Sequence, residues 1–222
     1  MKIPLSPRLK ACCEQVAPGA RVADVGCDHG YLSIYLLTNG IASAVYASDV
    51  AEGPLQSALR NSVKFGVRDR ISFYLSDGVK NVPRDFDTLV CAGMGGDTMV
   101  SILSAAPWLQ DARYRLVLQC QSKRELLRGY LSDHGWHIEK ELVLRDGRFL
   151  YTVMAVYYDP AAPRLTTGQC HFPPAMLVQP SEETREYYDR VIFSLNRAVT
   201  NAAEAADPNL QAALEELRGV TW

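Results

Sequence analysis

The sequence lacks a long apolar run. Of its 222 residues 48% are apolar, yet no window approaches the ~18 consecutive apolar residues that a membrane helix requires. The opening Met1-Lys2-Ile3-Pro4-Leu5 is followed by polar residues rather than by the apolar stretch of a signal peptide. We therefore expect a cytoplasmic chain without a membrane partner.

Patterns typical of metal ligands and of disulfides are also absent. The six cysteines include no Cys-x-x-Cys pair, and none stands at zinc-ligand spacing from any of the four histidines. The cysteines lie within or beside apolar runs, which favours buried free thiols in a reducing compartment over disulfides. The sequence therefore predicts no metal site.

What the sequence does contain is a regular alternation of strand and helix patterns. Apolar runs rich in β-branched residues cover 21–25, 44–48, 71–75, 87–92 and 115–120, and helical patterns cover 6–16, 30–38, 52–65, 97–105 and 123–134. This alternation is typical of a parallel sheet with right-handed helical crossovers. We therefore expect an α/β protein.

The next segment predicts how the sheet is completed. Strand patterns over 136–144 and 149–158 are joined by Arg145-Asp146-Gly147-Arg148, and Asp-Gly between two such runs is a hairpin signal. Five parallel strands and a C-terminal antiparallel hairpin make a seven-stranded sheet, unlike the all-parallel sheet of a nicotinamide dehydrogenase. The pattern predicts the Rossmann-like fold of class I methyltransferases.

The rest of the chain divides into a linker and a helical tail. Residues 159–180 are rich in proline and are expected to have little regular structure of their own. A helical apolar stripe follows, formed by Tyr188, Val191, Ile192, Leu195, Val199, Ala202 and Ala206, and a second short helix from Pro208 carries Leu210, Leu214 and Leu217. We therefore predict a methyltransferase-type domain over 1–158, a linker over 159–180 and a helical-hairpin tail over 181–222.

The strongest local signal is a strand that ends in a glycine turn and opens a helix, Asp24-Val25-Gly26-Cys27-Asp28-His29-Gly30-Tyr31-Leu32. Glycine permits close backbone approach, so a cofactor is able to lie against such a turn. A dinucleotide fold places a pyrophosphate here, but the carboxylate of Asp28 repels an anion. S-adenosylmethionine, with its cationic sulfonium and amino group, fits the turn. A tight turn without a ligand is the structural alternative.

Two further carboxylates are expected at the same edge of the sheet. Asp49 ends the second strand, 23 residues after Gly26, where an acidic side chain accepts hydrogen bonds from both ribose hydroxyls of a nucleoside. Asp77, in Ser76-Asp77-Gly78 after the third strand, suits the exocyclic amine of adenine. An Asp-Gly turn without function remains the alternative for Asp77.

The fourth strand runs into a glycine-rich segment, Ala92-Gly93-Met94-Gly95-Gly96-Asp97-Thr98-Met99. Bare backbone at the carboxyl edge lets a flat base approach closely, with carbonyls free to accept from an amine. The Asn-Pro-Pro-aromatic segment of nucleic-acid amino methyltransferases does not occur here. The side chain of Met94 is equally compatible with a role as core filler.

These segments together resemble the bacterial tRNA (adenine-22-N1)-methyltransferase family, of TrmK type. The likeness rests on residues 24–32 and 92–99, on Leu5-Ser6-Pro7-Arg8-Leu9, and on Gly135-Trp136 ahead of the Asp146-Gly147 turn. It covers residues 5–158, and the tail is similar to that family's coiled-coil appendage. The chain carries Gln119-Cys120-Gln121 where members carry Gln-Pro-Asn, and Asp49 where they often carry glutamate.

The resemblance implies transfer of a methyl group from S-adenosylmethionine to N1 of an adenine in the D-arm of tRNA. Because N1 has a free lone pair, the rate is expected to come from positioning rather than from a strong base. The adenine must be unpaired and turned into the pocket. A carboxylate on its N6 amine stabilises the positive charge of the product, and Asp28, assisted by the carbonyls of Ala92 and Gly93, is the candidate.

The candidate site residues lie at the carboxyl ends of the expected strands. The catalytic candidates are Asp28, Gly93 and Met94. The cofactor-binding candidates are Asp24, Gly26, Asp28, His29, Gly30, Tyr31, Asp49, Asp77, Gly78, Ala92, Gly93, Gly95 and Gly96. Tyr31 is in addition a candidate to stack on the adenine, unless it is a packing residue, and His29 is expected to orient the turn.

A strong net charge is absent, since 23 basic side chains stand against 25 acidic ones. Residues 171–222 hold four basic and eight acidic side chains, so the rest of the chain is slightly basic. An RNA-binding protein usually presents a basic face, and this distribution permits one without requiring it. Candidate phosphate contacts are Arg8, Lys10, Lys123, Arg124, Arg128, Arg145 and Arg148.

Other functions share part of this pattern. A methyltransferase acting on another RNA fits the same motifs, and one acting on a small molecule should carry an apolar lid, for which no insertion is present. A binding protein without catalysis would be expected to lose the turn glycines or Asp28, and both are retained. We expect a monomer or a weak dimer formed through the tail.

Overall fold

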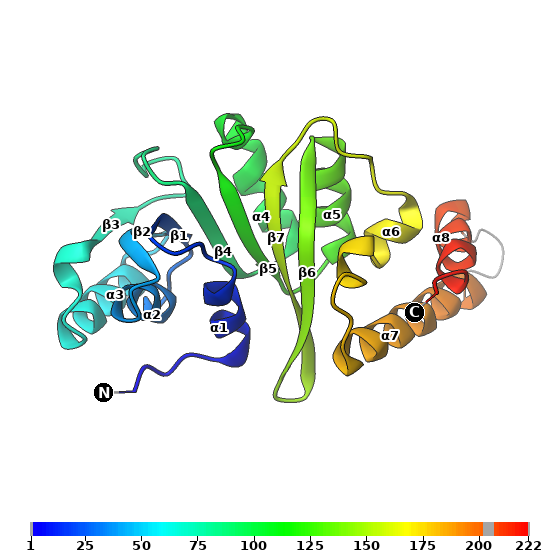
Figure 1. Cartoon of the computed structure of the whole chain (residues 1–222), viewed down its shortest axis with the longest axis horizontal. Coiled ribbons are helices and arrows are strands. Elements are labelled where there is room, and N and C mark those ends of the chain that lie inside the picture. Colours follow the sequence, from blue (N-terminus) through cyan, green and yellow to red (C-terminus); the bar gives the residue numbers. More distant parts are fainter. Residues whose placement is uncertain (1, 202–206, 222) are drawn as a thin grey trace.

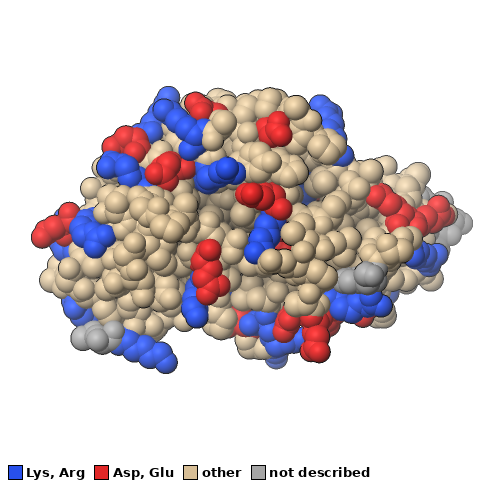
Figure 2. All heavy atoms as spheres, in the orientation of Figure 1, with Lys and Arg blue, Asp and Glu red and all other residues tan. Residues whose placement is uncertain are grey.

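The computed structural model describes residues 2–201 and 207–221. A central sheet carries helices on both faces, and the tail helices lie beside the hairpin end of that sheet (Figure 1). None of the described helices is long and apolar enough to cross a membrane. On the face that Figure 2 presents, basic and acidic side chains are interspersed, and no wide region of one sign covers it.

The sheet has seven strands in the order β3-β2-β1-β4-β5-β7-β6. The first five strands are parallel: β1 (Ala20–Val25), β2 (Ala42–Asp49), β3 (Ile71–Leu75), β4 (Thr88–Met94) and β5 (Arg115–Cys120). Strands β6 (Trp136–Asp146) and β7 (Phe149–Tyr158) form the antiparallel hairpin, and β7 pairs with β5. The predicted Rossmann-like methyltransferase fold is confirmed.

Eight α-helices are described: α1 (Pro7–Glu14), α2 (Tyr31–Thr38), α3 (Glu52–Lys64), α4 (Gly96–Ser104), α5 (Arg124–Asp133), α6 (Thr167–His171), α7 (Glu182–Asn201) and α8 (Pro208–Arg218). Three short 3₁₀ turns cover Arg68–Arg70, Pro107–Leu109 and Pro174–Met176. Helix α1 begins after Ser6, whose Oγ accepts the N–H of Leu9 at 3.5 Å, with Pro7 at its first position. This is a favourable helix start, because the Ser6 side chain satisfies one N–H of the first turn, and Pro7 has no N–H that would need a partner.

Alternate residues of the central strands face two apolar cores. Val90 and Val117 pack toward α1, α2 and α3, whereas Leu89 and Leu118 pack toward α4 and α5. Since successive side chains of a strand point to opposite faces, the continuous apolar runs of the sequence become strands that are buried on both sides. All six cysteines are free thiols, and all but Cys170 are buried.

The β6–β7 hairpin extends beyond the rest of the sheet. Strand β5 pairs with β7 only from Arg115 opposite Tyr157 to Leu118 opposite Met154, whereas β6 and β7 remain paired as far as Asp146 opposite Phe149. Because β7 runs antiparallel to β5, the hairpin turn projects past the carboxyl ends of the parallel strands. It therefore lies at the edge of the sheet where α/β proteins bind their ligands.

Residues 159–180 contain only two short helical elements, as expected, but the segment is packed rather than loose. Helix α6 begins with a capping box, in which Thr166 Oγ1 accepts the N–H of Gln169 at 3.1 Å and the Gln169 side chain accepts the N–H of Thr166 at 3.1 Å. The apolar side chains of Phe172 and Met176 are buried. The prolines mark short turns in a segment that packs against its neighbours rather than a loose connection.

The tail shares an apolar core with the hairpin. This cluster joins Val143 of β6 and Leu150 of β7 to Phe172, Met176, Tyr187, Leu195, Ala213, Leu214 and Leu217. The predicted stripe faces it through Tyr188, Val191, Ile192, Leu195 and Val199, while Ala202 and Ala206 lie outside the described residues. The second predicted helix is confirmed as α8, with Leu214 and Leu217 buried and Leu210 packed beside them.

A buried ion pair also connects the tail to the sheet. Arg128 of α5 and Glu141 of β6 are 0% and 2% exposed, and Arg128 Nη2 lies 2.7 Å from Glu141 Oε1. The guanidinium also donates to the carbonyls of Cys170 and His171, each at 2.9 Å, and to the hydroxyl of Tyr187 at 3.2 Å. The prediction of Arg128 as a phosphate contact is therefore wrong, because its charge is used inside the protein.

Candidate functional site

A hollow of about 310 Å³ lies at the carboxyl ends of β1 and β4. The strand order reverses between these two strands, because the chain continues from β1 outward to β2 and β3 and then returns to β4. Ligands of open α/β sheets bind at this topological switch point. The hollow is lined by Arg8, Leu9, Asp24, Gly26, Cys27, Asp28, His29, Tyr31, Leu32, Ala92, Gly93, Met94 and Gln121.

The turn after β1 forms one wall of the hollow. The N–H groups of Gly26 and Cys27 both donate to the carbonyl of Ser48, at 2.8 and 2.9 Å, which fixes the turn to the end of β2. Gly26 has a φ of 72°, and a Cβ at this position would overlap Cε of Met94. The positive φ therefore favours glycine here, and the end of the Met94 side chain occupies the space beside it.

Three carboxylates surround this turn, and they differ in burial. Asp24 is 3% exposed and accepts a hydrogen bond from Ser33 Oγ at 2.6 Å, and burial raises the pKa of its carboxyl to about 6. Asp28 has a φ of 50° and a side chain that is 72% exposed. Its N–H donates to Asp49 Oδ2 at 3.2 Å, and the other oxygen of Asp49 accepts the N–H of Ala51 at 3.1 Å.

The end of β4 forms the opposite wall. Gly93 has a φ of 82°, and its N–H donates to Gln119 Oε1 at 3.1 Å. The same oxygen accepts from Arg8 Nη1 at 3.2 Å, so α1, β4 and β5 are tied together at this point. Gln119 is fully buried, and its Nε2 has no hydrogen-bond partner among the described residues.

Comparison with known proteins identifies the family. A family model described as a methyltransferase domain matches residues 5–154. The structure of Bacillus subtilis tRNA methyltransferase TrmK superposes on this chain with a TM-score of 0.83 at 26% identity, and the match covers 98% of this chain and 95% of that one. The chain belongs to the methyltransferase family, in its TrmK type. The structure of Streptococcus pneumoniae Sp1610 in complex with S-adenosyl-L-methionine is similar at 28% identity and a TM-score of 0.83, covering 96% of this chain and 99% of that one.

The tRNA (adenine(22)-N(1))-methyltransferase of Bacillus subtilis is 32% identical over 154 residues. That alignment covers 69% of this chain and 65% of the relative, so it spans a little less than two thirds of that protein.

In this TrmK-type methyltransferase the structure brings most of the predicted site residues together. Eight of them line the hollow: Asp24, Gly26, Asp28, His29, Tyr31, Ala92, Gly93 and Met94. His29 Nε2 lies 3.7 Å from Asp28 Oδ1, and the rings of His29 and Tyr31 are 5.9 Å apart. Asp49 does not line the hollow but contacts the turn that does.

The remaining predicted residues have other surroundings in the methyltransferase. Asp77 Oδ2 lies 2.5 Å from Lys80 Nζ, and both line a separate depression of about 230 Å³. A Cβ on Gly78 would lie 3.1 Å from Ile102, and one on Gly30 would lie 2.8 Å from Ala58 Cβ. These two glycines thus allow helices to pack closely against the turns.

Gly95 and Gly96 also have a packing role in the TrmK-type domain. A Cβ on Gly96 would overlap the carbonyl oxygen of Lys123, and the N–H of Gly96 donates to the carbonyl of Ser122 at 2.8 Å. A Cβ on Gly95 would lie 3.0 Å from Ser122 Oγ. The loop before α5 therefore occupies the space that the missing side chains leave.

Three site residues were not predicted as such. Arg8, predicted only as a phosphate contact, lines the hollow, Gln119 holds the backbone of Gly93, and the side chain of Gln121 faces the same space. The available signal was the pair of glutamines at the end of a strand that is otherwise apolar. A polar side chain at the carboxyl end of a buried parallel strand is typical of a site residue.

Proposed function

We propose that this methyltransferase transfers a methyl group from S-adenosylmethionine to N1 of an adenine in tRNA, at position 22 in the D-arm. The observation that carries the proposal is the hollow at the switch point, where three carboxylates surround a glycine turn and bare backbone forms the opposite wall. The names of the relatives support the tRNA substrate and its position. A substrate of this kind also supports a cytoplasmic location, and we expect a monomer or a weak dimer.

The residues present fit S-adenosylmethionine. Asp24 is a buried carboxylate whose hydrogen-bond donors, the hydroxyl and the N–H of Ser33, are both neutral. A cationic amino group nearby would therefore compensate its charge. Asp49, at the end of β2, would accept hydrogen bonds from the ribose hydroxyls. The related Sp1610 structure contains S-adenosyl-L-methionine. The turn at Gly26 and the backbone of Ala92 and Gly93 would hold the cofactor between β1 and β4.

When bound, S-adenosylmethionine supplies a methyl group on a positively charged sulfur. The tasks of the protein are then to hold the adenine with N1 in line and to balance the positive charge that the base acquires. Asp28 carries an exposed carboxylate at the mouth of the hollow, suited to accept from the N6 amine. Attack by N1 needs no prior removal of a proton, because N1 has a free lone pair.

The proposed reaction is tested by mapping the product. Incubation with labelled S-adenosylmethionine and an unmodified tRNA transcript that carries adenine at position 22 should give N1-methyladenosine at that position alone. Replacement of this adenine by guanine in a second transcript should abolish labelling. Label at another nucleotide, or on a small molecule but on no tRNA, would contradict the proposal.

Substitution of Asp49 should weaken cofactor binding. Asp49→Ala should lower the affinity for S-adenosylhomocysteine by roughly 1 to 3 kcal/mol, because the ribose hydroxyls and the N–H of Asp28 lose their acceptor. Isothermal titration calorimetry measures the change. Asp111→Ala, which removes an exposed carboxylate paired with Arg113, is the matched control. Unchanged affinity in the Asp49 variant would refute the placement of the ribose.

Cofactor binding should depend on pH through Asp24. The pKa of Asp24 is raised to about 6 by burial, and a cationic amino group favours the ionised form. Below pH 6 the carboxyl must therefore release a proton on binding, so affinity for S-adenosylhomocysteine should fall about tenfold between pH 7 and pH 5. Calorimetry of the wild type and of Asp24→Asn tests this directly. If the affinity of the wild type depends on pH no more than the affinity of Asp24→Asn does, then no cationic group of the cofactor lies near Asp24.

A further inference from the structure

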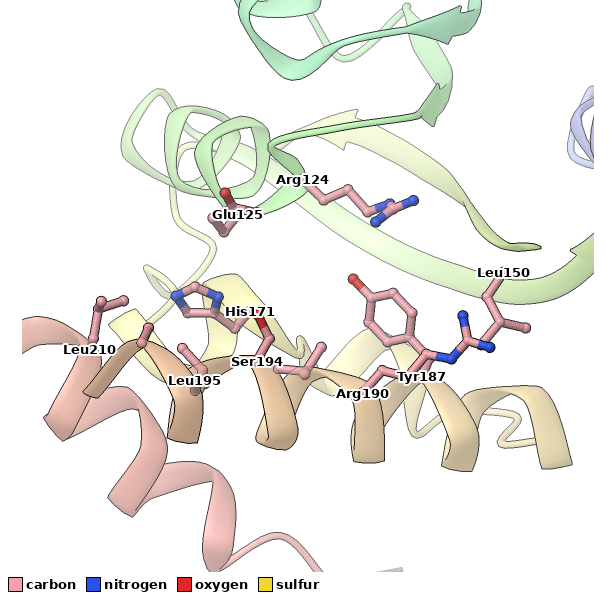
Figure 3. Close-up of a pocket in the computed structure, with 11 residues that line it drawn as sticks. Arg124, Glu125, Leu150, His171, Tyr187, Arg190, Ser194, Leu195 and Leu210 are labelled. Carbon is pink, nitrogen blue, oxygen red and sulfur yellow. The ribbon is translucent and has the colours of Figure 1, made fainter. Parts of the chain in front are cut away.

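The β6–β7 hairpin carries two aromatic side chains that belong to no apolar core. Neither Phe149 nor Tyr151 is part of the three apolar clusters that the described residues form, and Phe149 is 51% exposed. The two residues stand on alternate positions of β7 and therefore share one face of the hairpin. Leu150, between them, points to the opposite face, where it lines a hollow with Tyr187 and Arg190 of the tail (Figure 3). Both rings therefore face away from the tail.

This face of the hairpin leads to the hollow at the switch point. Arg8 lines that hollow, and its guanidinium lies 5.7 Å from the centre of the Tyr151 ring. The Tyr151 ring is in turn 6.4 Å from the ring of Phe149, at an interplanar angle of 68°. Arg8 Nε also lies 3.8 Å from Oδ2 of Asp146, the last residue of β6. A continuous row of side chains thus connects the wall of the hollow with the hairpin turn.

The outer end of this row carries a cation that the protein does not neutralise. The guanidinium of Arg148 lies 4.9 Å from the centre of the Phe149 ring. No ion pair within the described residues involves Arg148, whereas Arg145, before the turn, is paired with Glu186. The turn therefore presents a positive charge beside a flat apolar ring. Sites for unpaired nucleic-acid strands combine these two features, because cations contact phosphates and aromatic rings stack on bases.

The proposed reaction requires an adenine to leave its stack. N1 lies on the Watson–Crick edge of the base, so the base must be unpaired and turned out before a methyl group reaches it. Unstacking costs free energy, and the gap that remains exposes the faces of the neighbouring bases. Proteins that unstack bases frequently insert an apolar side chain between them. Such a side chain must be exposed, firmly held and close to the pocket that receives the base.

Phe149 meets these three conditions. Its side chain is half exposed, and the hairpin projects past the carboxyl edge of the sheet, where the hollow at the switch point lies. The backbone of Phe149 is paired with Asp146 in the last pair before the turn. The ring of Tyr151 packs edge to face beside it. The ring is therefore held at the rim of the site while much of its surface remains free to contact a base.

We propose that Phe149 is a wedge that takes the place of the target adenine in the RNA. Its ring stacks on a neighbouring base while the adenine occupies the hollow at the switch point, and Arg148 contacts a phosphate beside that base. This proposal rests on the proposed function, because it takes an adenine of folded tRNA as the substrate. Phe149 is thus a positioning residue, since it acts on the stack that the adenine leaves and does not touch the reacting atoms.

The first measurement follows the base apart from its methylation. A tRNA transcript with 2-aminopurine at position 22 fluoresces more strongly when this base leaves the stack. Saturating wild-type protein with S-adenosylhomocysteine should raise the fluorescence severalfold. Phe149→Ala should raise it much less, because the extruded state loses its stacking partner. Phe149→Tyr, which restores a ring, should recover most of the increase.

Methyl transfer provides the second measurement. In single-turnover assays at saturating cofactor and tRNA, Phe149→Ala should be slower than the wild type by about tenfold or more, because fewer of the bound adenines are extruded. Phe149→Tyr should transfer the methyl group at a rate close to that of the wild type. Affinity for S-adenosylhomocysteine should be that of the wild type in both variants, which verifies that they are folded.

Val63→Ala is the matched control. Val63 is 59% exposed near the end of α3, and a helix that follows a parallel strand ends at the edge of the sheet opposite its carboxyl edge. If the wild type methylates tRNA and Phe149→Ala behaves as Val63→Ala does in both measurements, the wedge proposal is wrong and the proposed function stands. The same holds if Phe149→Tyr is as impaired as Phe149→Ala.

The opposite outcome is equally distinct. If the fluorescence rises with the wild type and not with Phe149→Ala, but no methyl group reaches tRNA, the proposed function is wrong and the wedge proposal stands. If the wild type leaves the fluorescence unchanged, the base is not extruded and the wedge proposal is overturned.

Discussion

Replacement of Glu141 by alanine should lower the free energy of unfolding by about 3 to 5 kcal/mol, because it leaves the guanidinium of Arg128 buried without a counter-charge. Burial alone disfavours the charge of Arg128, but attraction to Glu141 outweighs it and holds the pKa of Arg128 above its ordinary value. The arginine therefore stays charged in the folded protein. Urea unfolding of the wild type and of the variant measures the difference.

The reason for a large effect is that every donor of Arg128 is engaged. Nε and Nη2 donate to the two oxygens of Glu141 at 3.0 and 2.7 Å, and the remaining N–H groups donate to two carbonyls of α6 and to the hydroxyl of Tyr187. Loss of the carboxylate removes the charged partner of a group that water does not reach. A buried charge without its partner destabilises a protein far more than the loss of an exposed ion pair.

Glu139 provides a matched control on the same strand. Its carboxylate lies 3.6 Å from Arg115, and both side chains are more than half exposed. Glu139→Ala should therefore change the free energy of unfolding by less than about 1 kcal/mol. The double variant Arg128→Met with Glu141→Leu removes both buried charges and should be more stable than Glu141→Ala. If Glu141→Ala unfolds no earlier than Glu139→Ala, the buried pair does not stabilise the junction with the tail.

Features with a local cause could be predicted from the sequence. Strands such as Ile71–Leu75 and Arg115–Cys120 follow from short β-branched runs, and the hairpin follows from Asp146-Gly147 between two such runs. The turn at Gly26 and the carboxylate of Asp49 follow from spacing along one βαβ unit. The turn at Gly26 and Asp49 lie close together because parallel strands have their carboxyl ends at the same edge of the sheet.

Features that depend on distant packing could not be predicted. Arg8 and Gln119 meet across 111 positions of the chain, and the meeting depends on how α1 lies on the sheet. Arg128 stands among other charged residues on an amphipathic helix, so its pattern is typical of an exposed residue. Only the arrival of α6 and of Tyr187 buries it. The packing of the proline-rich segment could not be predicted either, because its buried Phe172 and Met176 contact apolar residues of the tail, which are distant in the sequence.

The catalytic role proposed for Asp28 leads to the other large expected effect. Asp28→Ala should lower the rate of methyl transfer by about 10²-fold or more at saturating cofactor and tRNA, while affinity for S-adenosylhomocysteine changes little. The side chain is 72% exposed at the hollow, so its removal leaves no cavity in the core. Its backbone N–H, which donates to Asp49, is retained in the variant. Single-turnover kinetics measure the rate.

The backbone of Asp28 complicates the alanine variant, and two further variants resolve this. The φ of 50° is readily adopted by glycine and asparagine but is strained for alanine. Asp28→Gly therefore relaxes the turn without the carboxylate, and Asp28→Asn keeps the turn and an acceptor oxygen without the charge. Because the methylated adenine is a cation, we expect both variants to remain clearly slower than the wild type. If Asp28→Asn transfers the methyl group at the wild-type rate, and Asp28→Ala loses only cofactor affinity, then Asp28 is a structural contact of the cofactor and its charge has no part in the reaction.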